Sequence, residues 1–323
     1  MVYRAPDFKT VAIFGGTGFI GRYIVRDLAK RSWRVNVATR DADRARHLQP
    51  LGTVGQICPV FANVRDEAST AAAVRGADYV INLVGILYES GAQKFESVHA
   101  AGAGRIAKAA AEAGAERMIH ISAIGADPNS PSQYARTKAE GEKAVLDAFP
   151  DATILRPSIV FGPEDGFFNM FAGMARYLPV LPLIGGGHTR FQPVYVGDVA
   201  DAVMACLDDR KTCGKVFELG GPRVYSFRRL LEMILEETRR KRLLMPLPWP
   251  IARAQAKVLG ALPKPLLTPD QVTQLERDNV VADGAATLQD LGIEPTALEV
   301  ILPTYMDRYR LGGRFAARQK LNP

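Results

Sequence analysis

Two short patterns in the first half of the chain have the residue types and spacing that dinucleotide chemistry requires. The first is FGGTGFIG, from Phe14 to Gly21, which fits both GxxGxxG and GxGxxG. Glycines there allow a tight turn and a close approach of the backbone to a pyrophosphate, which the amides at the start of the next helix stabilise. The pattern predicts a dinucleotide site, and the alternative is a structural glycine turn. The predicted contacts in this segment are Gly15, Gly16, Thr17, Gly18, Phe19, Ile20, Gly21 and Arg22.

The second pattern is YxxxK, formed by Tyr134 and Lys138. Because residues i and i+4 share one face of a helix, the ammonium can lower the pKa of the phenol and also hold the ribose of a nicotinamide. A phenol in that position can donate a proton to a carbonyl that is being reduced. YxxxK is frequent by chance, so its meaning depends on the glycine loop that precedes it.

The residues after the second expected strand favour NADP(H) over NAD(H). An NAD site usually has an acid there for the ribose 2′-hydroxyl, whereas an NADP site has a cation for the 2′-phosphate. Here the strand ends at Arg40, and Arg22 begins the helix after the last glycine. Asp41 could serve as the ribose acid, but we favour capping of the next helix as its role. We therefore predict NADPH as the cofactor.

Later strand ends supply the remaining walls of the predicted pocket. Asn63 and Val64 follow the third strand and are expected to border the adenine. Leu83, Val84 and Gly85 follow the fourth strand and are expected beneath the ribose and pyrophosphate. The alternative for both segments is a plain strand-to-helix turn. The set of predicted cofactor contacts is completed by Ser122, Tyr134, Lys138 and Pro157.

The elements that must position these residues follow a regular alternation up to Pro157. Short runs rich in Val and Ile alternate with longer Ala-rich amphipathic stretches, which predicts an α/β fold with a doubly wound parallel sheet of Rossmann type. The expected strands are residues 10–14, 34–39, 56–61, 79–84, 117–121 and 152–155. The expected helices are residues 18–30, 43–49, 67–74, 94–113 and 133–148.

After Pro157 the connections become Gly- and Pro-rich, and the alternation stops. Further expected elements are a helix at 198–208, a strand at 215–219, a helix at 226–239 and a helix that begins after Thr268, with Pro269 in its first turn. We expect residues 1–165 to form the dinucleotide-binding core, with 192–222 returning to it. We expect 166–191 and 223–323 to form a smaller C-terminal region with partner or membrane-surface contacts.

The composition is that of a folded protein. With 323 residues, 47% hydrophobic and 23% charged, the chain is neither disordered, nor collagen-like, nor a disulfide scaffold. Its three cysteines form no CxxC motif and no metal-type cluster, so we expect a reducing compartment and no metal site. We see no signal peptide, and no apolar run reaches the roughly 20 residues of a transmembrane helix. Any membrane attachment is therefore expected to be peripheral.

The net charge of +7 comes from local clusters rather than from a basic domain, so we expect no nucleic-acid partner. Basic residues gather at 239–242 and in the tail at 307–323, which would suit an anionic membrane or an acidic partner. The apolar segment LLMPLPWPI follows the first cluster directly. This region could therefore lie on a membrane surface or a partner. The alternatives are a solvated face and an amphipathic lid over the region's own core.

The glycine loop and YxxxK together resemble the short-chain dehydrogenase/reductase superfamily, in its extended or atypical branches. In active members a Ser or Thr near the end of the fifth strand joins the Tyr and Lys. In HISAIG only Ser122 offers a hydroxyl, whereas Ala123 and Ile124 occupy the positions most expected to be catalytic. The resemblance implies an intact nucleotide half and a vestigial catalytic half, with Tyr134, Lys138 and Ser122 as the candidate catalytic residues.

Longer strings resemble one family more closely. They are GRYIV after the glycine loop, VINLVG, KAEGEK, RPSIVFGPED, QPVYV and DLGI. Over almost the entire chain they look like the NAD(P)H-binding accessory subunits of respiratory complex I, NADH:ubiquinone oxidoreductase, in a bacterial form without a targeting leader. The resemblance implies tightly held NADPH with no assigned turnover and other complex I subunits as partners. It also implies a peripheral position on the cytoplasmic face of the inner membrane.

Two other functions remain open from the sequence. A free NADP-dependent reductase, epimerase or dehydratase would use Tyr134 and Lys138 on a small substrate. A soluble nucleotide-sensing regulator would bind the nucleotide without catalysis. Co-purification with membranes separates the accessory subunit from both alternatives, and substrate-dependent oxidation of NADPH identifies the enzyme.

Overall fold

The computed structural model describes residues 8–262 and 265–313. Seven strands form one sheet in the order β11-β6-β5-β4-β1-β2-β3, and every pair from β3 to β6 is parallel. Because the strand order reverses beside β1, the sheet is doubly wound, as the alternation predicts. Its strands are β1 (Thr10–Phe14), β2 (Arg34–Thr39), β3 (Ile57–Phe61), β4 (Tyr79–Asn82), β5 (Arg117–Ile121), β6 (Thr153–Pro157) and β11 (Val216–Leu219).

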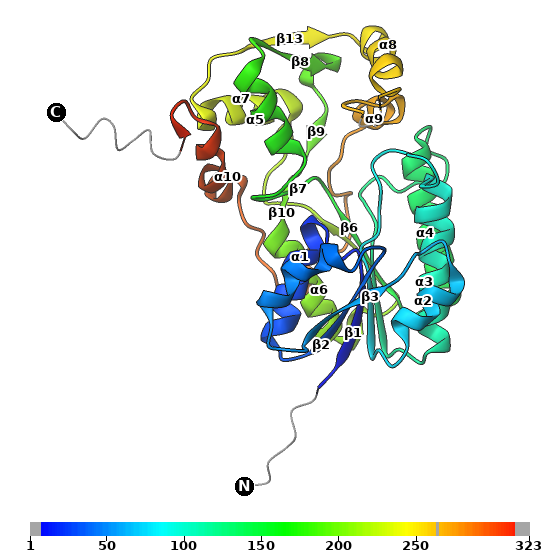
Figure 1. The fold of residues 1–323 in the computed structure, drawn as a ribbon. Helices are drawn as coiled ribbons and strands as arrows, with labels where there is room; N and C mark the ends of the chain where they lie inside the picture. The colour runs from blue at the N-terminus through cyan, green and yellow to red at the C-terminus, as the bar shows by residue number, and fades with distance from the viewer. Residues whose placement is uncertain (1–7, 263–264, 314–323) are drawn as a thin grey trace, which may run out of the picture. The chain divides into compact units, whose positions relative to one another are not determined.

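Helices cover both faces of this sheet, with α2, α3 and α4 on one face and α1 and α6 on the other (Figure 1). Their bounds are α1 (Phe19–Lys30), α2 (Glu67–Val74), α3 (Ala101–Glu112), α4 (Gln133–Ala148) and α6 (Val196–Asp208). Side-chain caps set two of the starts, because Asp66 accepts from the amides at the beginning of α2 and Ser132 from that of Ala135 in α4. The expected helices at 67–74 and 133–148 are confirmed at the same residues.

Two expected helices differ in type from the sequence prediction. Asp43–Leu51 is a 3-10 helix, and Pro50, which lacks an amide N–H, lies in its last turn. The expected helix at 94–113 is interrupted, because a π-helical turn over Glu96–Ala100 precedes α3. Such wide turns occur mostly as single turns and frequently at functional sites.

The chain divides into two compact units. Unit 1 is Met1–Arg156 with Val199–Phe217, and unit 2 is Pro157–Asp198 with Glu218–Pro323. The sequence predicts instead that the first region ends at 165 and regains residues 192–222. The chain enters unit 2 earlier because β7 (Val160–Phe161) pairs with β10 (Val194–Tyr195) rather than extending the large sheet.

Small side chains fill one of the buried clusters of unit 1. More than half of the buried residues in this cluster are alanine, including Ala12 on β1 and Ala103 on α3. Alanine lets helices approach a sheet closely, and glycine lets them approach more closely still. A Cβ on Gly141 of α4 would lie 2.2 Å from the carbonyl oxygen of His99, in the π-helical turn.

Aromatic side chains fill the core of unit 2. Phe227 is 1% exposed, and the rings of Phe167, Phe171 and Phe191 lie 5.5–6.3 Å from its own.

The expected helix after Thr268 is confirmed, with a capping box between Thr268 and Gln271. The remaining elements are α5 (Phe167–Tyr177), β8 (Val180–Ile184), β9 (Arg190–Phe191), β12 (Tyr225–Ser226), α7 (Phe227–Thr238), β13 (Leu243–Leu247), α8 (Trp249–Leu259), α9 (Pro269–Leu275) and α10 (Leu298–Met306).

The apolar segment after the first basic cluster is partly a cover for this core. Leu247 is buried and Trp249 packs against the core cluster, whereas Leu243 and Met245 of β13 are exposed. β13 pairs with β8 in parallel. Leu244, Leu247 and Trp249 thus act as the lid that is one of the alternatives open from the sequence, whereas the other residues of β13 are exposed. No helix in the described part of the chain has the length and apolar character to cross a membrane.

Candidate nucleotide site

The glycine loop joins β1 to α1 and is packed so tightly that side chains would disrupt it. Gly15 has a left-handed φ of +82°, and a Cβ there would lie 3.1 Å from the carbonyl carbon of Leu83. A Cβ on Gly21 would lie 2.4 Å from the carbonyl oxygen of Gly15 and 2.6 Å from the Cα of Gly16. The first turn of α1 thus lies directly against the loop, which is the role of the last glycine in a dinucleotide fingerprint.

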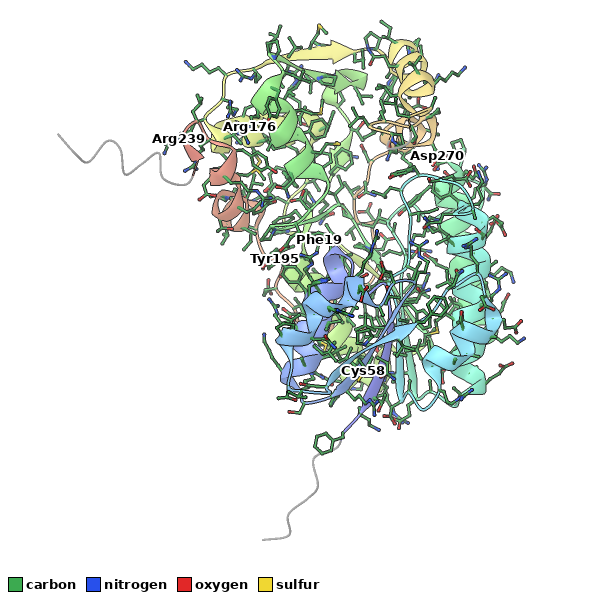
Figure 2. The ribbon with its side chains drawn as sticks, in the orientation of Figure 1. Phe19, Cys58, Arg176, Tyr195, Arg239 and Asp270 are labelled. Carbon is green, nitrogen blue, oxygen red and sulfur yellow. The ribbon has the colours of Figure 1, made fainter. Side chains whose placement is uncertain are left out.

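The start of α1 can receive an anion. Gly18 is its N-cap, makes no side-chain cap, and is followed by no acidic residue in the first turn. The amides of that turn, which begins at Phe19 (Figure 2), therefore have no side-chain acceptor from the cap. Gly18 is exposed, and only the carbonyl oxygen of Gly15 lies within 4 Å of where its Cβ would be. The loop leaves room for a pyrophosphate at the helix N-terminus and fits this part of a dinucleotide.

The sheet order brings the predicted strand-end residues to one edge. Leu83 donates its amide N–H to the carbonyl of Phe14 over 2.9 Å, so the end of β4 lies beside the glycine loop. Ser122 donates its N–H to Leu155 over 2.7 Å, at the end of the neighbouring β5. Pro157 is the last residue of β6. The residues that the sequence singles out thus lie at the ends of β4, which neighbours β1, and of β5 and β6, the next two strands in the sheet.

The end of β2 carries the predicted cation. Arg40 follows β2, is exposed, and has no acidic partner among the described residues. Asp41 accepts from the amide of Asp43 over 3.0 Å and lies 3.5 Å from the guanidinium of Arg44. Its carboxylate is therefore used at the start of the 3-10 helix, although the N-cap residue itself is Ala42.

Asn63 and Val64 take part in a strand-to-helix turn, one of the two roles open to them. The side-chain oxygen of Asn63 accepts from the amide of Arg65 over 3.2 Å. Val64 packs against the core of unit 1, and its carbonyl accepts from Arg105 over 3.2 Å. These contacts account for both residues locally, and their predicted role beside the adenine stays a prediction.

Lys138 is buried, at 5% exposed, beside the end of β4. Its ammonium donates to the carbonyl of Ile121 over 3.1 Å and lies 3.6 Å from the position of a Cβ on Gly85. Burial lowers the pKa of Lys138 to about 8, and the negative charge of Glu142 partly opposes this shift. Lys138 is thus a cation that loses its proton easily, held where the fourth and fifth strands end.

His99 lies against the predicted tyrosine and is not among the site residues predicted from the sequence. The rings of His99 and Tyr134 meet edge to face at 5.2 Å. His99 Nε2 accepts from the amide of Ile86 over 2.9 Å, so the ring proton is on Nδ1, which donates to the Thr137 hydroxyl over 3.2 Å. That hydroxyl in turn donates to the carbonyl of Tyr134 over 3.1 Å. The chain fixes both the tautomer and the orientation of the ring.

His120 is a second buried imidazole, and the sequence predicts no role for it. The side-chain oxygen of Asn82 accepts from Val84, so its amide group donates to His120 Nδ1 over 3.0 Å. The ring proton is therefore on Nε2. His120 Nε2 and the Ser122 hydroxyl are both buried and have no hydrogen-bond partner in the described chain. Buried polar atoms without partners are uncommon and mark a strained or functional place.

Both imidazoles are neutral at physiological pH. Burial lowers the pKa of His99 and of His120 to about 3, and the nearby charge of Lys138 contributes in the same direction. A polar residue inside an apolar strand, such as His120 in RMIHI, is the sequence signal that could have found this cluster. No group of His, Cys, Asp and Glu within residues 8–262 and 265–313 is arranged to hold a metal.

Comparisons with known proteins agree with this geometry. The model of the NAD dependent epimerase/dehydratase family matches residues 11–220. The chain is 41% identical to NADH dehydrogenase (ubiquinone) 1 alpha subcomplex subunit 9 of Arabidopsis thaliana, over 93% of this chain and 78% of that one. It is 38% identical to the Mus musculus protein of the same name, over 92% and 80%. A dTDP-glucose 4,6-dehydratase from Streptomyces venezuelae, solved with NAD bound, shares the fold at a TM-score of 0.70 and 20% identity, over 93% and 96%.

Proposed function

Because the chain belongs to the NAD dependent epimerase/dehydratase family and to the family of NADH dehydrogenase (ubiquinone) 1 alpha subcomplex subunit 9, we propose that it is an accessory subunit of respiratory complex I. In this role it holds NADPH as a structural ligand that is not turned over. Its partners are the other subunits of the complex, and its place is peripheral, on the cytoplasmic face of a bacterial inner membrane.

The observation that carries the proposal is a contrast within the site. The glycine loop is packed as a pyrophosphate requires, with no room for side chains at Gly15 and Gly21. At the end of β5, by contrast, the one hydroxyl is that of Ser122, which is buried, and Ala123 and Ile124 follow it. A site that keeps the binding half and lacks the expected reactive hydroxyls suits retention of a nucleotide better than its turnover.

Each side chain has a binding role under this proposal. NADPH supplies a hydride in enzymes of this fold. Here the α1 amides receive the pyrophosphate, and Lys138 supplies a buried ammonium beside Gly85 for the nicotinamide ribose. His99 holds the Tyr134 ring by edge-to-face contact and keeps its own proton on Nδ1. Arg40 supplies the cation for a 2′-phosphate, which favours NADP(H) over NAD(H).

A structural ligand stabilises the folded chain by mass action. A nucleotide that binds only the folded state adds RT ln(1 + [L]/Kd), or about 4 kcal/mol at a thousandfold excess over Kd. This effect gives a protein a reason to retain a ligand that it does not consume. It also makes assembly of the complex depend on the nucleotide.

The test is purification from native membranes, with mass spectrometry of the proteins and nucleotide that co-purify with the wild type and with Gly18→Val. The variant side chain enters the space above the α1 amides, so we expect loss of the nucleotide, a lower melting temperature and poor assembly into complex I. Gly173→Val is the control, since nothing lies within 4 Å of a Cβ there. Normal assembly of a Gly18→Val protein shown to carry no nucleotide would refute the structural role.

The same preparation separates the two remaining functions. Oxidation of NADPH that depends on an added carbonyl substrate, and is lost in Tyr134→Phe, would identify a free reductase, epimerase or dehydratase. Nucleotide binding without membrane co-purification and without turnover would identify a soluble regulator.

A further inference from the structure

Four arginines from three separate segments of unit 2 line one hollow of about 410 Å³. They are Arg176 in the last turn of α5, Arg240 after α7, and Arg308 and Arg310 after α10. Arg176 and Arg239, the neighbour of Arg240, appear on the same side of unit 2 in Figure 2. The hollow is therefore a product of the tertiary fold rather than of one basic run.

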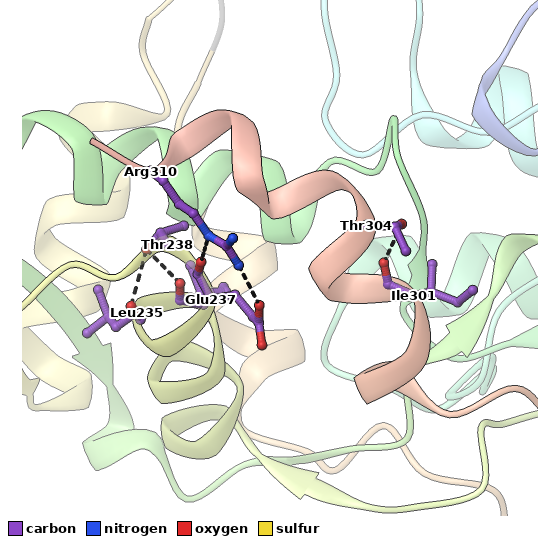
Figure 3. A network of polar contacts seen from close by, with 7 residues as sticks. Leu235, Glu237, Thr238, Ile301, Thr304 and Arg310 are labelled. Atoms are coloured by element: carbon purple, nitrogen blue, oxygen red, sulfur yellow. Dashed lines mark hydrogen bonds and ion pairs between the residues drawn. The ribbon is translucent and has the colours of Figure 1, made fainter. Parts of the chain in front are cut away.

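Hydrogen bonds to the scaffold fix three of these side chains. Arg240 Nε donates to the carbonyl of Tyr309 over 2.9 Å, and Arg308 donates to that of Pro163 over 2.8 Å. Arg310 Nε donates to the carbonyl of Glu237 over 2.7 Å, and its guanidinium pairs with the same residue's carboxylate at 3.2 Å (Figure 3). Fixed guanidinium groups lose little side-chain entropy when an anion binds.

The hollow has an excess of positive charge. None of the residues that line it is acidic, and the carboxylate of Glu237 offsets only Arg310. Desolvation lowers the pKa of Arg240, and the charges of Arg242 and Arg176 lower it further. Like charges held together repel, and a bound anion of several oxygens relieves that repulsion by accepting from more than one guanidinium.

Exposed apolar side chains border the arginines. Tyr177 is 78% exposed and Leu311 is 74% exposed, and both line the hollow. Leu178 follows Tyr177 and is 43% exposed. Leu243, 65% exposed, donates its amide to Pro179 over 3.1 Å, so the exposed start of β13 lies beside the same segment. A soluble phosphate needs no apolar surroundings, whereas a lipid presents its phosphate next to acyl chains.

We propose that this hollow binds the phosphate of an anionic phospholipid headgroup, with Arg176, Arg240 and Arg308 as its ligands and Tyr177 and Leu311 in contact with the upper acyl chains. The inference rests on the proposed peripheral membrane attachment and names the surface that makes it. The proposed nucleotide site lies in unit 1, away from this hollow in unit 2. An experiment can therefore refute lipid binding without refuting nucleotide binding, and the reverse.

The test is flotation of the purified full-length chain with phosphatidylcholine vesicles that do or do not contain phosphatidylglycerol or cardiolipin. The pocket variant is Arg176→Gln/Arg240→Gln. The control is Arg228→Gln/Lys257→Gln, which removes the same charge from exposed positions of α7 and α8 outside the hollow. We expect binding only to the anionic vesicles, and a loss in the pocket variant roughly tenfold greater than in the control. Retention of nucleotide and the melting temperature are measured on each variant.

Three outcomes would overturn the inference. Equal losses in the pocket and control variants would mean that net charge alone drives binding. Equal binding to neutral vesicles would exclude headgroup recognition. Full competition by inorganic phosphate or pyrophosphate would make the hollow a site for a soluble anion.

If the double variant does not fold, the single variant Arg176→Gln is used for the same comparison, because Arg176 is exposed and makes no hydrogen bond within the described chain. Arg176→Lys/Arg240→Lys should recover part of the binding.

Discussion

The two units of this chain differ in their core residues and in the charged or titratable side chains that they bury. Unit 1 buries Lys138, His99 and His120, keeps the imidazoles neutral, and has one alanine-rich cluster in its core. Unit 2 has a group of contacting phenylalanines in its core and gathers arginines on its surface. Its buried Asp165 accepts from the Tyr305 hydroxyl over 2.7 Å and from the amide of Phe168 over 2.6 Å.

Under the two proposals, this difference matches what each unit binds. A dinucleotide in a cleft at a sheet edge requires backbone amides, close helix packing and a few groups whose charge depends on burial. A surface that contacts a phosphate in water requires permanent charges, and arginine keeps its proton at any physiological pH. Small residues in unit 1 permit the close approach that such packing requires.

The largest expected effect tests the aromatic core. Phe227→Ala should lower the free energy of unfolding by about 3–5 kcal/mol, because it removes a fully buried ring from a cluster of four. Denaturant unfolding measures the loss. The matched control in unit 1 is Val145→Ala, which removes a smaller buried side chain from the alanine-rich cluster and should cost less. A loss in Phe227→Ala no larger than in the control would contradict the contrast between the cores.

Arg40→Ala tests the permanent charge at the edge of unit 1. We expect the preference for NADP(H) over NAD(H) to fall by one to two decades, since a charge-assisted bond to a 2′-phosphate is worth roughly 1.5–3 kcal/mol. Titration of both nucleotides measures the ratio. Arg46→Ala is the control, because that exposed arginine pairs with Asp43 within the 3-10 helix. Equal affinities for the two nucleotides in the wild-type protein would refute the assignment.

His99→Gln tests whether the buried, neutral imidazole of His99 makes the stability of the protein depend on pH. In the folded protein the pKa of His99 is about 3, against 6.5 for an ordinary histidine, so below pH 6.5 the unfolded chain takes up a proton that the folded chain does not. Stability therefore falls as the pH falls from 6.5 toward 3. The free energy of unfolding should therefore fall by about 2 kcal/mol less between pH 7 and pH 5 in the variant than in the wild type. Urea unfolding at the two pH values decides, and an unchanged difference would mean that His99 is not buried neutral.

Tyr134→Phe should have the smallest effect. The ring keeps its edge-to-face contacts with His99 and Phe95, and only the phenol is lost. We expect nucleotide retention and the activity of complex I to stay within experimental error of the wild type. The measurement is nucleotide content and NADH oxidation in purified complexes. A large loss of either would show that the phenol takes part in chemistry and would favour the enzyme function.

Local patterns were sufficient to predict most of unit 1. The strands at 10–14, 34–39 and 117–121 are confirmed at the same residues, because a buried parallel strand is a continuous apolar run that turns interrupt. The wide turn at Glu96–Ala100 was not predicted, since the sequence pattern of a π-helical turn does not differ from that of an α-helix. That turn carries His99.

The sequence by itself determined the doubly wound sheet, the glycine loop, the spacing of Tyr134 and Lys138, and the family. These depend on interactions within about one turn or one strand, whose residue preferences are visible in the chain. Only the tertiary structure decided that His120 and Ser122 have buried atoms without partners, and that Arg176 joins arginines more than sixty residues away in one hollow. Such groupings arise from packing between segments that are distant in the sequence. The free energy of that packing depends on many residues at once, so no local sequence pattern predicts it.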